Sequence, residues 1–310
     1  MSTPHDTTAW AQAIARHHAN LQIGPPLSAA DVTLPADVTL PADAHLPEAQ
    51  AAALQGARML DFIEADARCV AQAWWHQTQR LGQFDPLHWP DQALDFQMPT
   101  WPRQNAFAPC PRALGLYAVL PNAQWVARMA QAGVPTLQLR FKSDKPAEVA
   151  TEVRAAVKAV EGTETLLFIN DHWQHAIDAG AYGVHLGQED LDSADLMAIR
   201  KAGLRLGLST HGYAEMMRAD ALSPSYIAMG AVFPTTLKNM PTAPQGLGRL
   251  GAYAKLMEGH SLVAIGGIDE TRFADVIRTG VGSIAVVRAL VTAADPEETA
   301  RDLMRRLAGI

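Results

Sequence analysis

Cysteine is almost absent from this 310-residue chain. Only Cys69 and Cys110 occur, and they form neither a Cys-x-x-Cys pair nor a dense, even pattern. This scarcity excludes a disulfide-stapled secreted scaffold and favours a reducing compartment. Basic blocks are also missing, because 25 Lys and Arg residues stand against 32 Asp and Glu residues, with a net charge of −7. We therefore expect no nucleic-acid partner.

Long apolar runs are missing as well. The chain holds no stretch of about 18 consecutive apolar residues of the kind that spans a membrane. Its first residues, Met1–Asp6, lack the basic start and apolar run of a signal peptide. We expect a cytoplasmic protein that acts on small molecules and has no membrane partner.

Two parts of different character meet near residue 111. Residues 1–111 carry weak, interrupted patterns, whereas residues 112–310 alternate short apolar runs with helical stretches. Repeated prolines over residues 90–111 predict a linker without helix or central strand. Three tandem copies of Asp-x-x-Leu-Pro, starting at residue 31, form a low-complexity segment to which we assign no chemistry.

A helical stripe is the clearest pattern in the first part. Between residues 51 and 80 the apolar side chains recur at spacings of 3 and 4, at Leu60, Ile63, Ala67, Val70 and Trp74. Such a stripe predicts a helix that packs against a partner surface. The nearby His and Trp pairs are interpreted as packing residues. We hypothesise that this extension is an oligomerisation arm of a homo-oligomer or a cover for the second part.

The second part reads as eight strand-then-helix units. Its predicted strands are 115–120, 136–140, 166–170, 183–186, 204–209, 226–230, 262–267 and 283–287. Predicted helices between them include 145–160, 194–201, 270–278 and 296–307. Strands that alternate with helices imply right-handed crossovers and a parallel sheet. Because no Gly-x-Gly-x-x-Gly follows the first strand, we predict a (β/α)₈ barrel over 112–310 and not an open doubly wound sheet.

Polar side chains end or follow most of these strands. In a (β/α)₈ barrel the carboxyl ends of the strands meet at one rim, where chemistry gathers. The polar groups are Gln138, Arg140 and Lys142 after strand two, Asn170 and Asp171 after strand three, Asp190 after strand four, Ser209 in strand five and Lys238 after strand six. A structural explanation exists for each alone, such as a helix cap or a solvated lysine, but not for the joint pattern.

These groups are suited to a diphosphate. Arg140, Lys142 and Lys238 supply fixed positive charge, and Asp171 with Asp190 forms a pair of hard oxygen ligands of the kind that Mg²⁺ prefers. A second anion site is indicated where Gly266 and Gly267 end strand seven, because bare backbone amides there commonly hold a phosphate.

Residues 114–310 resemble the thiamine-phosphate synthase family, whose barrels include thiazole tautomerases. The resemblance rests on the strings QLRFK at 138–142, INDHW at 169–173, GVHLGQEDL at 183–191, GLSTH at 207–211, FPTTLK at 233–238, APQGL at 243–247 and AIGGI at 264–268. It implies a transferase that joins hydroxymethylpyrimidine diphosphate to a thiazole phosphate. Because a kinase domain is sometimes fused to this family, the resemblance leaves a degraded kinase remnant as a further alternative for the N-terminal 110 residues, although they are too short for that whole domain.

The resemblance also implies a role for each residue. The pyrimidine diphosphate would be held by Gln138, Leu139, Arg140, Phe141, Lys142, Asn170, Ser209 and Lys238. The thiazole phosphate would be held by Thr235, Thr236, Leu237, Gly267, Val287 and Arg288. One Mg²⁺ per site would be bound by Asp171 and Asp190. The catalytic side chains would be those of Arg140, Lys142, Ser209 and Lys238, acting on a dissociating diphosphate without an enzyme nucleophile.

Three residues depart from the family pattern. Ala231 stands where a proline is common, Leu237 where a second threonine is usual, and Arg288 where a small serine is frequent. All three lie toward the thiazole phosphate, so we expect altered affinity there with catalysis retained. The alternatives are a tautomerase, which needs a general acid and base in place of the diphosphate clamp, and a non-catalytic phosphate-ligand sensor.

Overall fold

The computed structural model describes residues 7–23, 48–100, 103–235 and 242–309. It divides into two compact units. The larger unit comprises Trp101–His211 and Leu222–Ile310, and the smaller comprises Met1–Thr100 with Gly212–Ala221.

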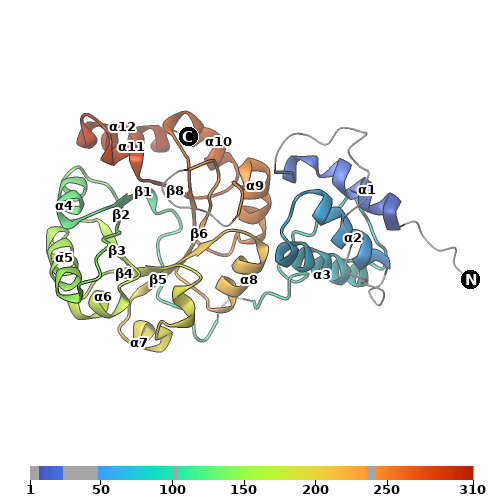
Figure 1. Cartoon of the computed structure of the whole chain (residues 1–310), viewed down its shortest axis with the longest axis horizontal. Coiled ribbons are helices and arrows are strands. Elements are labelled where there is room, and N and C mark those ends of the chain that lie inside the picture. Colours follow the sequence, from blue (N-terminus) through green and yellow to red (C-terminus); the bar gives the residue numbers. More distant parts are fainter. Residues whose placement is uncertain (1–6, 24–47, 101–102, 236–241, 310) are drawn as a thin grey trace, which may run out of the picture. The chain divides into compact units, whose positions relative to one another are not determined.

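The larger unit is built on a closed barrel of eight parallel strands in sequence order, with β8 paired back onto β1 (Figure 1). The strands are β1 (Gly115–Leu120), β2 (Thr136–Leu139), β3 (Leu166–Asn170), β4 (Gly183–Leu186), β5 (Arg205–Thr210), β6 (Tyr226–Met229), β7 (Leu262–Ile265) and β8 (Ser283–Val286). The predicted (β/α)₈ barrel is confirmed.

Helices connect successive strands on the outside of the barrel, as Figure 1 shows for α4 to α7. They are α4 (Ala123–Gln131), α5 (Pro146–Ala159), α6 (Trp173–Ala179), η2 (Asp190–Asp192), α7 (Leu196–Lys201), α9 (Gly246–Leu256), η3 (Glu270–Arg272), α10 (Phe273–Arg278), α11 (Arg288–Val291) and α12 (Pro296–Ala308). Local signals fix their starts. The Asn122 side chain accepts the Trp125 N–H at the start of α4, and the Asp295 side chain accepts the Glu298 N–H at the start of α12.

Most predicted boundaries agree with the structure to within one or two residues, and two details are informative. Strand β2 ends at Leu139, so Arg140 lies just beyond it, although the Arg140 N–H still donates to Leu120 O. The helix predicted over 270–278 is split into a 3₁₀ turn and α10, because the Asp269 side chain caps the turn by accepting the Thr271 N–H.

Aromatic side chains fill part of the barrel interior. Tyr117, Phe168 and Tyr226 are buried together, with Phe168 stacked on Tyr117 and edge-on to Tyr226. Small residues such as Ala228 and Ala285 pack beside them. This alternation of large and small side chains makes the interior a packed core and leaves the rim for chemistry.

The smaller unit consists of α1 (Thr7–His17), the turn η1 (Ala19–Leu21), α2 (Glu48–Met59), α3 (Glu64–Leu81) and α8 (Tyr213–Ala221). Its core is aromatic. Trp74 is fully buried, Trp89 contacts it edge-on, and the Trp89 indole N–H donates to the Tyr213 hydroxyl at 2.9 Å. His18 lies edge-on to both tryptophans, which agrees with its interpretation as a packing residue.

The prediction of a single helix across the apolar stripe is wrong. The chain breaks between α2 and α3, where Asp61 takes a left-handed backbone conformation with φ of 62°. Ile63 then precedes α3 and is 49% exposed, whereas Leu60, Val70 and Trp74 are fully buried. Among the described residues, no helix has the length and apolar character needed to cross a membrane.

Candidate active site

The loop after β2 carries the first group of predicted site residues. Gln138 lies in β2 and is buried, and its side chain hydrogen-bonds the Tyr117 hydroxyl inside the barrel. Leu139 is buried on the opposite face of the strand because side chains alternate, so only its backbone can face a ligand. Arg140 is half-buried, and Lys142 is exposed. The loop therefore presents its cations at the carboxyl end of the barrel.

The Asp171 and Asp190 side chains lie close together and interact. Burial raises the pKa of Asp171, and the neighbouring Asp190 charge raises it further. The charges of His172 and Arg140 lower the pKa of Asp171. The Arg140 guanidinium therefore lies near enough to act on this carboxylate. The structure does not use Asp171 as a helix cap, since α6 begins after His172 with no side-chain cap.

The backbone fixes both carboxylates. Asp171 has a left-handed φ of 63°, and its N–H donates to His185 O at 3.0 Å. One carboxylate oxygen of Asp190 accepts the Gly187 N–H at 2.9 Å. In the part of the chain that is described, no group of three or more His, Cys, Asp and Glu side chains could hold a metal ion. The pair is thus a partial ligand set, which suits Mg²⁺ bound mainly by substrate oxygens and water.

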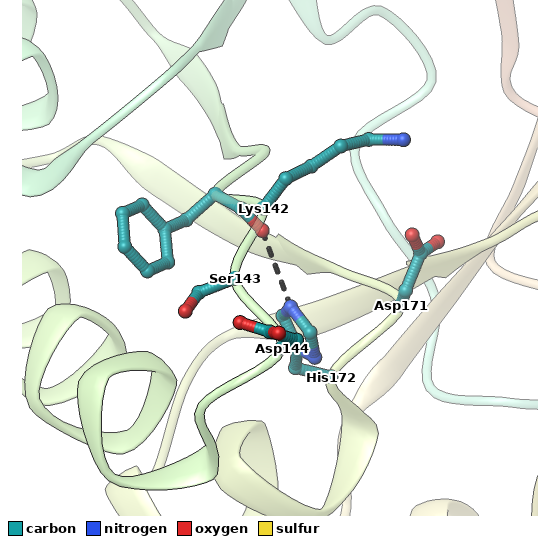
Figure 2. Close-up of a pocket in the computed structure, with 6 residues that line it drawn as sticks. Lys142, Ser143, Asp144, Asp171 and His172 are labelled. Carbon is teal, nitrogen blue, oxygen red and sulfur yellow. Dashed lines mark hydrogen bonds between the residues drawn. The ribbon is translucent and has the colours of Figure 1, made fainter.

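An open hollow of about 530 Å³ lies beside Asp171. It is lined by Phe141, Lys142, Ser143, Asp144, Asp171 and His172 (Figure 2). In Figure 2 the side chains of Lys142 and Asp171 extend to the same side. The His172 ring is tied to the β2 loop by a 3.2 Å hydrogen bond between Nε2 and Phe141 O. The loops after β2 and β3 are therefore held together around the hollow.

Ser209 joins the same rim through His185. The Ser209 hydroxyl lies 2.8 Å from His185 Nε2, and the Ser209 carbonyl accepts a hydrogen bond from the Gln188 amide. Burial lowers the pKa of His185 to about 4, and the Arg140 charge contributes to the shift. His185 is therefore neutral near pH 7. Sequence reasoning gave His185 no role, although a histidine inside a buried strand was the available signal.

Asn170 ends β3 and is buried, and its backbone pairs with His185. Its carbonyl accepts the His172 N–H at 2.7 Å. Gln138, Arg140, Asn170, Asp171 and Ser209 thus all lie within one residue of the carboxyl ends of β2, β3 and β5.

The Gly266–Gly267 pair lies at the end of β7, as predicted. Both glycines have positive φ, 102° and 64°, and the Phe233 N–H donates to Gly266 O. A Cβ on Gly267 would lie 2.5 Å from Pro234 O, so only glycine fits this approach. The β7 end is thereby packed against the segment that leads into Thr235.

The remaining thiazole-side residues divide into two groups. Val287 is half-buried after β8, and Arg288 is exposed at the start of α11. Thr236 and Leu237 lie outside the described residues, as does Lys238 of the pyrimidine diphosphate site, and the roles of all three stay predictions.

Comparison with protein families gives a match to the barrel. Residues 116–290 match the family model described as thiamine monophosphate synthase. This range runs from β1 to α11, so it contains every strand that carries a predicted site residue.

Individual relatives agree with that match. A thiamine-phosphate synthase from Neisseria meningitidis serogroup A is 58% identical over 191 residues, which cover 62% of this chain and 93% of the relative. One from Cronobacter sakazakii is 53% identical over 204 residues, covering 66% of this chain and 97% of the relative. Among solved structures, thiamine phosphate pyrophosphorylase from Pyrococcus furiosus aligns with a TM-score of 0.56 at 26% identity, covering 64% of this chain and 98% of that one.

Proposed function

The chain belongs to the thiamine monophosphate synthase family, and on that basis we propose that it joins 4-amino-2-methyl-5-hydroxymethylpyrimidine diphosphate to a thiazole phosphate. The products are thiamine phosphate and pyrophosphate. The observation that carries the proposal is the Asp171–Asp190 pair beside Arg140 at the barrel rim, within the family match.

The pyrimidine diphosphate is bound at the ends of β2 to β6. Gln138 and Asn170 contact the pyrimidine, while Arg140, Lys142, Ser209 and Lys238 bind the diphosphate, with the backbone of Leu139 and Phe141 lining the site. Support comes from the rim positions of the described members and from the half-buried Arg140, whose charge acts on Asp171 and His185.

The thiazole phosphate is bound on the other side of the rim. Its anionic oxygens are held by backbone amides at Gly267 and at Val287 and Arg288, together with the loop Thr235, Thr236 and Leu237. The positive φ of Gly267 and its close packing against Pro234 support this assignment. A leucine at position 237 removes one hydroxyl contact, a loss on the order of 1 kcal/mol.

Mg²⁺ fits the donor set at Asp171 and Asp190. Burial raises the pKa of Asp171, and repulsion by the adjacent Asp190 carboxylate raises it further; a bound cation would relieve that repulsion. When bound, the ion neutralises charge on the diphosphate oxygens.

The chain's own residues act on the leaving group. Arg140, Lys142 and Lys238 stabilise the negative charge that develops as the bond between the pyrimidine methylene and the diphosphate oxygen breaks. The Ser209 hydroxyl donates a hydrogen bond to the diphosphate and is not acylated. The electron-rich aminopyrimidine carries the resulting positive charge, and the thiazole nitrogen, held opposite the methylene carbon, forms the new bond.

The test is product analysis with purified protein. Thiamine phosphate is expected only when both substrates and Mg²⁺ are present. If the protein instead interconverts thiazole phosphate tautomers without any pyrimidine substrate, it is a tautomerase. Binding of thiazole phosphate without any turnover would indicate a sensor and would contradict the proposal.

A further inference from the structure

A chain of hydrogen-bonded side chains crosses the barrel interior from β2 to β5. The Tyr117 hydroxyl lies 2.7 Å from that of Tyr226, which lies 2.6 Å from His185 Nδ1. His185 Nε2 lies 2.8 Å from the Ser209 hydroxyl. At the other end, the Gln138 side chain hydrogen-bonds Tyr117. We call these five residues, Gln138, Tyr117, Tyr226, His185 and Ser209, the barrel relay.

Four of the five relay side chains are buried and closely packed, and Ser209 is half-buried. Gln138, Tyr117 and Tyr226 are each less than 5% exposed, and His185 is 7% exposed. Phe168 lies edge-on to Tyr226, and the His185 ring stacks on the Tyr226 ring. Water therefore does not compete for the hydrogen bonds among the four buried side chains, and the two tyrosine hydroxyl protons have to follow the direction set by their neighbours.

Only two directions satisfy the whole relay. In the first, the Gln138 amide donates to Tyr117, Tyr117 to Tyr226, Tyr226 to His185 Nδ1, and His185 Nε2–H to Ser209. The Ser209 hydroxyl group can then donate a hydrogen bond toward the rim of the barrel. In the reverse direction Ser209 donates inward to Nε2, and it presents only lone pairs to the rim.

We propose that His185, Tyr226 and Tyr117 are positioning residues. The two tyrosines hold His185 in the Nε2–H tautomer, and His185 in turn orients the Ser209 hydroxyl so that it donates a hydrogen bond to the diphosphate leaving group. This inference rests on the proposed function, because an anionic ligand at Ser209 selects the outward direction. The same direction leaves the carbonyl oxygen of Gln138 free to accept from the aminopyrimidine. The relay thus couples the two ends of one substrate through the barrel core.

The tautomer is measured directly by nuclear magnetic resonance of the full chain labelled with ¹⁵N-histidine. Long-range ¹H–¹⁵N correlations separate the two neutral tautomers, and the His185→Gln variant identifies the signal. We expect the Nε2–H tautomer in the complex with Mg²⁺ and inorganic pyrophosphate, because the bound anion selects the outward direction. The Nδ1–H tautomer would overturn the inference. This readout needs no turnover, so it decides the relay even if the proposed function fails.

Kinetics supply a second test through a double-mutant cycle. Ser209→Ala is expected to lower kcat about 100-fold, as for the loss of one preorganised donor, and His185→Asn at least about tenfold. His185→Asn in the Ser209→Ala background should cost less than about twofold more, because the hydroxyl it positions is gone. Additive losses would indicate a merely structural role and overturn the inference.

Conservative variants refine this cycle. His185→Gln, whose amide nitrogen can replace Nε2, should recover much of kcat, and the KM for thiazole phosphate should not move. Tyr226→Phe should lower kcat when Ser209 is present and should have little effect in the Ser209→Ala background. Tyr182→Phe is the matched control, since Tyr182 immediately precedes β4 at the opposite end of the barrel and lies outside the relay. A loss of kcat in that control equal to the Tyr226→Phe loss would also contradict the assignment.

Discussion

Gly207 of β5 and Tyr226 of β6 are register partners, and the tyrosine ring lies directly against the glycine. A Cβ on Gly207 would overlap the ring and its hydroxyl group. The absence of a side chain at position 207 therefore creates the space that Tyr226 occupies in the barrel relay.

Gly207→Ala should consequently destabilise the barrel and slow catalysis. Overpacking at a buried site typically costs about 1–3 kcal/mol, and the displaced Tyr226 hydroxyl would no longer fix His185. Denaturant unfolding and kcat are the measurements. Gly251→Ala is the control, because a Cβ there meets only Thr279 Cβ at 4.0 Å. Because position 251 lies within helix α9, Gly251→Ala should raise the free energy of unfolding by about 0.5–1 kcal/mol. Equal behaviour of the two variants would refute the packing argument.

Asp171→Asn should raise stability in the absence of divalent cations. The pKa of Asp171 is raised by burial and by Asp190, so its charge opposes folding at any pH above that pKa. The neutral amide removes this penalty, and asparagine tolerates the positive φ of 63° at this position. Thermal unfolding in chelator at pH 7 is the measurement, with the exposed Asp178→Asn of α6 as the control.

The same variant should lose its response to Mg²⁺. Adding Mg²⁺ should raise the melting temperature of the wild type and of Asp178→Asn, because only the folded state presents the carboxylate pair. Asp171→Asn should show a much smaller rise. A full Mg²⁺ response in Asp171→Asn would place the ion elsewhere.

His18 should make the smaller unit sensitive to acid. Burial lowers the pKa of His18 to about 4, and the neighbouring His17 and His88 act in the same direction, while Asp85 and the hydrogen bond to Pro86 O oppose them. Since the unfolded chain takes up this proton near pH 6.5, the stabilisation is present above that pH and is lost as the pH falls toward 4. Unfolding followed by tryptophan fluorescence should show a weaker pH dependence in His18→Gln. Identical slopes would contradict this prediction.

Asp66 should stabilise the smaller unit through α8. Its carboxylate accepts the Ala214 N–H at 2.8 Å at the start of that helix, and the side chain is 3% exposed. Asp66→Ala should cost about 1–2 kcal/mol, as for the loss of a helix cap, in urea unfolding. Asp66→Asn retains an acceptor and should recover most of the loss. A loss of equal size in Asp66→Asn would show that burial, and not capping, sets the effect.

Regular alternation of strands and helices made the barrel predictable from the sequence, because strands such as β6 and β7 are apolar throughout and each lies between a serine and a glycine. The apolar stripe from Leu60 to Trp74 gave a wrong prediction of one continuous helix. Its 3- and 4-residue spacing continues across the break between α2 and α3, where Asp61 takes a left-handed backbone conformation. Periodicity reports side-chain spacing and does not detect such a local reversal.

The site was predictable where chemistry is carried by unusual residues at strand ends, as with the Asp171–Asp190 pair. The barrel relay was not, because Tyr117 and Tyr226 are ordinary strand residues by composition. Their contact joins positions 109 residues apart, and only the closed barrel brings them together. Thr236, Leu237 and Lys238 stay predictions from the sequence.

The most direct test of the synthase assignment is pyrophosphate release by the purified full chain, given hydroxymethylpyrimidine diphosphate and Mg²⁺ with and without thiazole phosphate. We predict release that depends on thiazole phosphate and is lost in Asp190→Ala. Folded wild-type protein that releases no pyrophosphate under these conditions would contradict the assignment.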